Sequence, residues 1–291
     1  MNLRKIVISL LYFPFLIFNG FLRFFRIEGT KIRILLMHDI PIDKYEDFKS
    51  IILSISKRWN FISALELENY LSGKHKLKGR HVLLTFDDGF HSNRLIADEI
   101  LDPLEIKALF FVIGQFVDLK NHEDQQKFIK NNLYPKWRGH DYPENLKEMK
   151  NMDIEDLKHL VRQGHCIGFH STSHENLASL AEESELKKEI IEGALKLERE
   201  LGQKINHFSF GFGNIDYFSK EALEIAQRQF NYIHTGMRGD NSEDTPVWAL
   251  RRDTISLSDS NIEISSFLEG TADRRYTKKL KRYESWLKDA I

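Results

Sequence analysis

The sequence predicts an α/β fold in which βα units surround a parallel sheet or barrel. From residue 32 onward, apolar runs of strand length alternate with segments of helical spacing. Two early runs end in acidic or imidazole side chains, and the active sites of barrel proteins form at the carboxyl ends of strands. The chain of 291 residues shows no internal repeat or low-complexity linker, so one domain is preferred.

The expected elements follow one another along the chain. Strands are predicted at residues 32–38, 81–86, 107–113, 165–170, 205–213, 230–236 and 247–255. Helices are predicted at residues 43–59, near 91–101, at 152–164 and near 182–201, where Gly202 ends the pattern. The basic tail from residue 274 predicts a helix that caps the fold or touches a membrane. Residues 119–150 are polar and break the alternation, which indicates an insertion or lid in a barrel domain of residues 31–291.

Residues 1–30 predict a membrane-associating segment. Residues 6–22 carry no charge over 17 positions, which is at the short end for a spanning helix. Basic residues follow this run, and it is not followed by a cleavage site of small residues. We therefore expect an anchor or an interfacial helix rather than a signal peptide. A buried core helix is the alternative. More basic residues follow the segment than precede it, which favours a catalytic domain on the cytoplasmic face.

Composition excludes several classes of function. Lysine and arginine total 42 against 43 aspartates and glutamates, and a net charge of -1 gives no reason to expect nucleic acid as a partner. The single cysteine, Cys166, rules out an internal disulfide and a zinc site built from several thiolates.

The segment "HSTSH" (170–174) carries a candidate pair of metal ligands. His170 and His174 are four residues apart, so on one helical turn both imidazoles point the same way. A histidine pair alone has ordinary structural explanations. Together with an aspartate at the end of strand 81–86, it forms a set of two histidines and one carboxylate that leaves positions open for water and substrate.

The segment "LLTFDDGF" (83–90) supplies that aspartate and a second one beside it. Adjacent residues that leave a strand point in different directions, so one carboxylate can bind a metal while its neighbour serves as a base. Gly89 permits a sharp turn, and an ordinary turn is the alternative interpretation.

These motifs resemble those of the NodB-homology polysaccharide deacetylases, carbohydrate esterase family 4. "TFDDG" (85–89) is similar to the family's first motif and "HSTSH" to the second, within a similarity over roughly residues 32–256. The resemblance implies a deformed (β/α)7-type barrel and Asp87 as catalytic base. It also implies a divalent metal, expected to be Zn²⁺, with Asp88, His170 and His174 as its ligands.

The third motif departs from the family pattern. "SFGFG" (209–213) lacks the arginine and the proline of the commoner Arg-x-Pro-Tyr-Gly form. By resemblance, the backbone N–H of Phe212 contacts the oxyanion. With no arginine at position 209, we expect Arg252, or alternatively Arg251, to orient Asp87 from the last strand. A surface ion pair with Asp253 or with an acid of residues 119–150 is the other interpretation.

The general acid has an unusual predicted place. The chain has no histidine after His234, so the family's late Leu-x-His motif is missing. "ILLMHDI" (34–40) stands before the first motif instead, as in the circularly permuted members of the family. Because a barrel brings its first and last strands together, we expect His38 to be the acid, with Asp39 or another carboxylate holding its tautomer.

The resemblance therefore implies a metal-dependent hydrolase that removes an N-acetyl group from an amino-sugar glycan or glycan precursor. Tyr134, Trp137 and Tyr142 could stack on sugar faces, although packing explains them equally. Two alternatives stay open: a deformylase or deacetylase of a lipid-linked sugar at a membrane surface, and a pseudoenzyme that binds glycan without turning it over.

Overall fold

The computed structural model describes residues 14, 29–136, 139 and 141–288. Its strands are β1 Lys31–Met37, β2 Asn60–Phe61, β3 Arg80–Phe86, β4 Leu109–Val112, β5 Cys166–Phe169, β6 His207–Ser209, β7 Tyr232–His234 and β8 Asp253–Thr254. Its α-helices are α2 Tyr45–Ser56, α3 Ala64–Leu71, α4 His91–Ile96, α5 Gly114–Asp118, α6 His122–Phe128, α7 Ile154–Arg162, α8 Glu183–Lys187, α9 Gly193–Leu201, α10 Lys220–Gln229, α11 Asn261–Leu268 and α12 Thr277–Lys288.

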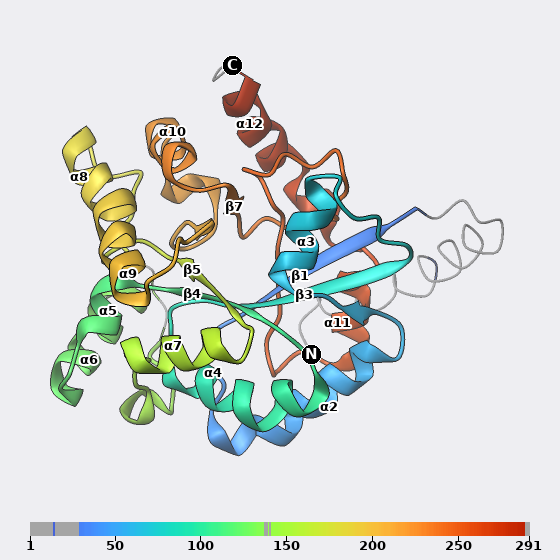
Figure 1. The fold of residues 1–291 in the computed structure, drawn as a ribbon, viewed down its shortest axis with the longest axis horizontal. Helices are drawn as coiled ribbons and strands as arrows, with labels where there is room; N and C mark the ends of the chain where they lie inside the picture. The colour runs from blue at the N-terminus through green and yellow to red at the C-terminus, as the bar shows by residue number, and fades with distance from the viewer. Residues whose placement is uncertain (1–13, 15–28, 137–138, 140, 289–291) are drawn as a thin grey trace.

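The strands form a parallel barrel. Their hydrogen-bonded order is β7-β6-β5-β4-β3-β1-β8, with β2 added beside β3. The two ends of this order meet, because β8 pairs with β1 while Leu250, just before β8, forms a parallel bridge with His234 of β7. Helices such as α2, α4, α7, α9 and α10 surround the strands in Figure 1. The predicted deformed (β/α)7-type barrel is confirmed.

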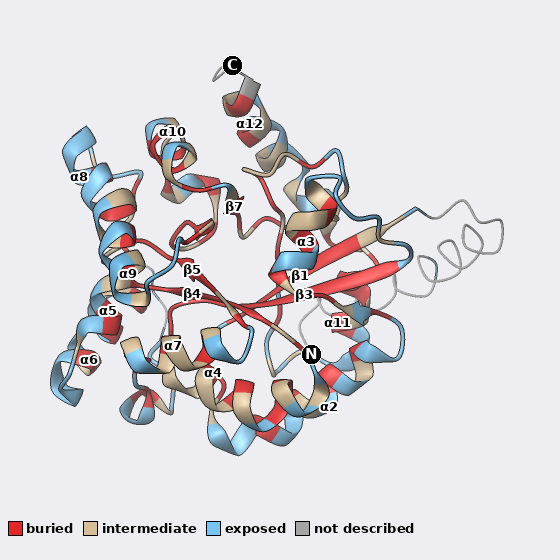
Figure 2. Cartoon of the chain, in the orientation of Figure 1, coloured by how far each residue is buried: buried red, intermediate tan, exposed pale blue. Residues whose placement is uncertain are grey.

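Two neighbouring strands of the barrel, β1 and β3, are its longest. All seven residues of β3 are buried, and so are all those of β1 after Lys31. Figure 2 shows the contrast between these buried strands and the exposed outer faces of the helices. The register pairs Met37 with Phe86, the last residues of the two strands. Residues 38 and 87 therefore leave the barrel side by side at its carboxyl end.

Most of the predicted elements are present, with shorter ends. The predicted helix near 182–201 is confirmed, although a π turn, Lys188–Glu192, separates α8 from α9. Helices α3, α5, α6, α10 and α11 are absent from the prediction. The basic tail forms α12, and its buried Tyr283 donates a hydrogen bond to the carbonyl of Trp248, so the helix caps the fold.

The predicted membrane-associating segment falls almost wholly outside the described residues. Within the part of the chain that the structure describes, no helix is both long enough and apolar enough to cross a membrane.

Candidate active site

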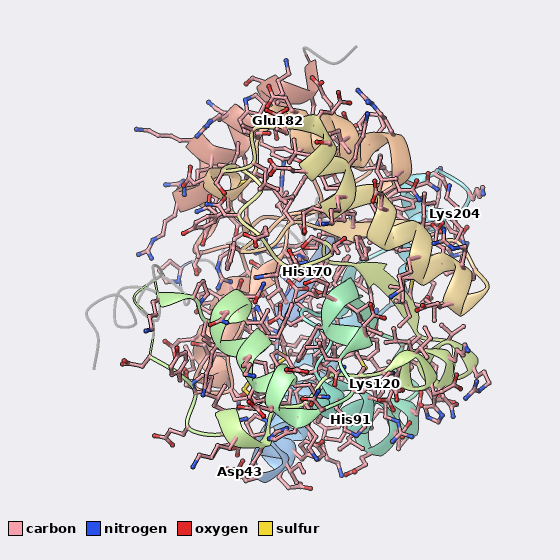
Figure 3. The ribbon with its side chains drawn as sticks, turned by 90° about the vertical axis from the view of Figure 1, so that its left-hand side faces the viewer. Asp43, His91, Lys120, His170, Glu182 and Lys204 are labelled. Atoms are coloured by element: carbon pink, nitrogen blue, oxygen red, sulfur yellow. The ribbon has the colours of Figure 1, made fainter. Side chains whose placement is uncertain are left out.

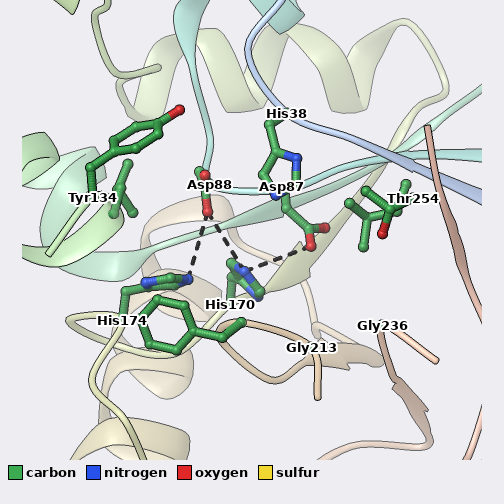
Figure 4. Close-up of a pocket in the computed structure, with 12 residues that line it drawn as sticks. His38, Asp87, Asp88, Tyr134, His170, His174, Gly213, Gly236 and Thr254 are labelled. Atoms are coloured by element: carbon green, nitrogen blue, oxygen red, sulfur yellow. Dashed lines mark ion pairs between the residues drawn. The ribbon is translucent and has the colours of Figure 1, made fainter. Parts of the chain in front are cut away.

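Asp87 and Asp88 follow the last residue of β3, and their side chains diverge. The N–H of Asp87 donates to the carbonyl of Met37 at 2.9 Å, which continues the strand pairing by one residue. Asp88 has a φ of 76°, in the left-handed region that aspartate tolerates better than most residues. The backbone changes direction between them, so that Asp87 faces Arg252. Asp88 lies beside His170 and His174, as Figure 4 shows.

His170 and His174 converge as predicted, but not on a helical turn. The segment after β5 is a loop, and Ser171 and His174 have φ values of 68° and 63°, which no helix contains. The carboxylate of Glu189 holds this loop, since it accepts hydrogen bonds from the N–H and the hydroxyl of Ser173 at 2.9 and 2.7 Å. The helical expectation was wrong because these long-range contacts, and not local spacing, set the loop.

The geometry of Asp88, His170 and His174 fits a metal ion. The Nδ1 of His170 donates to the carbonyl of Ser209 at 2.8 Å, and that of His174 donates to the carbonyl of Asn132 at 3.0 Å. Each Nε2 is therefore left with a lone pair, the arrangement that metal-binding histidines adopt.

The separations within this group also suit an ion. The three ligand atoms lie within 4.8 Å of one another, and Oδ1 of Asp88 is 3.7 Å from Nε2 of His170 and 3.8 Å from Nε2 of His174. Two metal–ligand bonds of about 2.0–2.1 Å span such a gap. Burial also lowers the pKa of His174 to about 4, despite the opposing charge of Asp88, so its imidazole is neutral at pH 7.

Arg252 holds Asp87 in place. Its Nη1 and Nη2 donate to the two carboxylate oxygens of Asp87 at 2.6 and 2.9 Å, and neither side chain is open to solvent. Ser209 and the carbonyl of Thr235 fix the guanidinium in turn, at 2.5 and 3.0 Å. Arg251 points elsewhere and pairs with Glu284 at 3.1 Å. Of the two predicted arginines, the structure places Arg252 on Asp87.

Asp87 stays ionised despite its burial. Burial raises the pKa of this carboxyl group, but the charge and the hydrogen bonds of Arg252 are the main opposing influence, and the net shift is downward from 3.8. Asp253, the alternative partner for these arginines, pairs with Arg33 at 2.7 Å instead.

His38 reaches the site from β1, which lies between β3 and β8 as expected for the first strand of a closed barrel. Its exposed side chain lines the same pocket as Asp87 and Asp88. The carboxylate of Asp39 accepts hydrogen bonds from Ser92 and Asn145 at 2.7 and 2.6 Å. Asp39 is thus engaged by residues other than His38.

Phe212 lies at the rim of the pocket in the third motif. It has a φ of 60°, rare for a bulky residue, and strained backbone of this kind is concentrated at functional sites. Its ring packs edge-on against His174, with the centroids 4.4 Å apart. Gly211, the position at which the family pattern has proline, lies against the same histidine. A Cβ at residue 211 would meet Cδ2 and Nε2 of His174 at 3.1 and 3.2 Å.

Replacing Gly211 with alanine is expected to weaken metal binding by up to about tenfold, because the imidazole of His174 must shift to make room for the added Cβ. The metal dissociation constant, measured by competition with a chelator, gives the comparison. Gly29→Ala is the control, since a Cβ there meets nothing within 4 Å. Equal affinity in the two variants would show that His174 can move without consequence for the site.

The pocket has a volume of about 380 Å³, at the small end of the usual range for ligand sites, about 300–1,000 Å³. Residues 119–150 form one wall through Leu133 and Tyr134, while Thr254 lies on the side of Asp87 (Figure 4). Of the three predicted aromatics, only Tyr134 lines this pocket; Tyr142 is 42 % exposed outside it, and Trp137 lies outside the described residues. Figure 3 shows His170 near the middle of the molecule, with Asp43 and Lys204 toward its edges.

Several supporting residues were not predicted. Asn132 and Ser209 hold the two histidines through backbone carbonyls, which every residue type carries. Glu189 acts on the loop between the histidines from a distant turn. None of these residues has a local sequence signal for its role.

A parallel barrel with carboxylates and histidines at the carboxyl ends of its strands has the layout of an enzyme active site. The family model "Polysaccharide deacetylase" matches residues 74–230. The chain belongs to this family, as its resemblance to the NodB-homology deacetylases implied.

Solved structures share the fold. A deacetylase from Streptococcus pyogenes, PplD, in complex with acetate is 19% identical, with a TM-score of 0.63 over 83% of this chain and 99% of its own. IcaB from Ammonifex degensii is 22% identical, with a TM-score of 0.62 over 84% and 99%. A de-N-acetylase from Aggregatibacter actinomycetemcomitans is 14% identical, with a TM-score of 0.62 over 81% and 99%. A search of curated proteins gives no match.

Proposed function

We propose that the protein is a metal-dependent hydrolase that removes the N-acetyl group from an amino sugar of a glycan or glycan precursor. One observation carries the proposal: an ionised, arginine-held Asp87 lies 3.7 Å from His170, a member of a buried group with ligand atoms within 4.8 Å of one another. The family to which the chain belongs supports the same chemistry.

The residues divide the reaction between them. Asp88, His170 and His174 would hold a divalent ion, with Zn²⁺ expected, which when bound supplies a Lewis acid and makes water easier to deprotonate. Asp87 accepts the proton of the attacking water as the C–O bond forms. The backbone N–H of Phe212 donates to the oxyanion.

His38 completes the cycle. When the amide C–N bond breaks, its imidazole donates the proton that converts the leaving nitrogen into an amine, and the acyl group leaves as a carboxylate. The position of His38 in the same pocket as Asp87 supports this assignment.

The test combines metal analysis with a screen for acyl release. The purified full chain is incubated with free, polymeric and lipid-linked amino sugars that carry acetyl or formyl groups, and the released acetate or formate is measured. We expect about one tightly held metal ion per chain and release of acetate, both lost on chelation. Bound glycan without any release would favour the pseudoenzyme, and formate from a lipid-linked sugar would favour the deformylase.

We also propose that residues 1–30 associate the barrel domain, residues 31–291, with a membrane whose cytoplasmic face it occupies. The uncharged run of residues 6–22 and the basic residues after it support this. Deleting residues 1–26 is expected to move the protein from the membrane fraction to the soluble fraction of cells. An unchanged distribution would contradict the proposal.

A further inference from the structure

A second pocket adjoins the active-site pocket. Its volume is about 310 Å³, and the two pockets share His174 and Phe212 as walls. These shared side chains are held firmly, because the ring of Phe212 contacts the ring of His174 at 4.4 Å and that of Tyr217 at 5.2 Å. A ligand longer than one sugar can therefore occupy both pockets, with Phe212 beside the junction.

The second pocket is lined mainly by uncharged polar side chains. Asn131, Asn132, Asn176 and Ser179 contribute amides and a hydroxyl. The side-chain oxygen of Asn176 accepts the N–H of Ala178 at 3.2 Å, which leaves its amide N–H groups for other partners. Amides both donate and accept hydrogen bonds, as the recognition of sugar hydroxyls requires.

One charge distinguishes this pocket from an ordinary polar cleft. Glu175 lines it with an exposed carboxylate that, among the described residues, takes part in no ion pair or hydrogen bond. The pocket thus offers a carboxylate to a cationic group next to the sugar that reacts.

We propose that the second pocket binds the adjacent sugar of the same glycan when its amine is already free, with Glu175 holding the ammonium group. This inference rests on the proposed function, because the ammonium is the product of the proposed reaction. A sugar deacetylated in one turnover becomes the occupant of this pocket in the next. The enzyme would then favour partly deacetylated chains over fully acetylated ones.

The test compares three substrates with the full chain loaded with metal. They are a fully acetylated amino-sugar oligomer, the same oligomer with one free amine beside an acetylated residue, and a small aryl acetate that occupies only the active-site pocket. The variant is Glu175→Gln, which keeps the shape and removes the charge. Glu155→Gln is the matched control, since Glu155 is an exposed residue of α7 outside both pockets.

The wild type is expected to prefer the partly deacetylated oligomer. Glu175→Gln should raise KM for this oligomer about tenfold, because a hydrogen bond between charged groups is lost. Its hydrolysis of the aryl acetate and its metal content should match those of the wild type and of Glu155→Gln. The inference would be overturned if the wild type preferred neither oligomer. It would also be overturned if Glu175→Gln and the wild type had the same KM for the partly deacetylated oligomer.

Two further outcomes of the same experiment have different meanings. A fall in aryl acetate hydrolysis in Glu175→Gln would mean that the residue acts through His174, which also overturns the inference. No release of acetate by the wild type from any substrate would overturn the proposed function itself.

Discussion

Replacing Asp87 with asparagine is expected to lower kcat by about 10²–10⁴-fold, the usual contribution of a general base, while leaving the bound metal in place. Asparagine has the same shape but cannot accept the proton of the attacking water. The three proposed ligands, Asp88, His170 and His174, are untouched. Acetate release and metal content, measured on the same preparation, check the expectation.

Asp88→Asn is the matched comparison, because it changes the neighbouring carboxylate in the same way. We expect this variant to lose metal as well as activity. If Asp87→Asn lost metal and Asp88→Asn kept it, the two roles would have to be exchanged. Thermal unfolding of both variants is needed too, since Asp87→Asn leaves Arg252 buried without its anionic partner.

Replacing Arg252 with methionine is expected to destabilise the protein by about 3–5 kcal/mol, because the change leaves the buried Asp87 without its partner. Activity should fall as well, since the base loses both its orientation and its charge partner. Arg251→Met is the control beside it in the chain. Arg251 pairs with Glu284 near the surface, and the loss of such a pair costs about 0–1 kcal/mol. Similar losses of stability in both variants would contradict the buried-pair interpretation.

The pH dependence of the reaction rate distinguishes a role of Arg252 in positioning Asp87 from a role in stability alone. The pKa of Asp87 is lowered in the folded protein, so the pair with Arg252 adds stability above the unfolded pKa and loses it as pH falls through the folded one. Without Arg252, burial is the largest remaining influence and raises the pKa of Asp87. The acidic limb of the rate profile should therefore move to higher pH in Arg252→Met, which a purely structural role for Arg252 would not cause.

Local sequence signals predicted the barrel well, and they also predicted that His38 and Asp87 lie at its carboxyl end. The apolar strands placed His38 and Asp87 at neighbouring strand ends, and the register of β1 and β3 confirms that arrangement. Three of the missed helices carried a local signal, which went unused. Helices α3, α10 and α11 begin at the N-caps Ser63, Ser219 and Ser260, each of which accepts a hydrogen bond from the first turn.

Contacts between distant residues could not be predicted in the same way. Arg251 and Arg252 are adjacent and point to opposite sides, and only the closure of the barrel decides which one faces Asp87. The loop from His170 to His174 takes its shape from Glu189 in another element. The helical spacing of the two histidines therefore predicted correctly that their side chains converge, but for a wrong local reason.

The path of β1 sets how far the reaction lies from the place where the chain enters the barrel. Lys31 begins the strand and His38 follows its last residue at the pocket, so the two are separated by roughly 20 Å at the rise of an extended strand. In an enzyme tethered through residues 1–30, the active site would thus lie well away from the point where the tether enters the barrel. This separation suits a substrate in a glycan strand that extends away from the membrane surface better than a substrate whose acyl group is buried in the membrane.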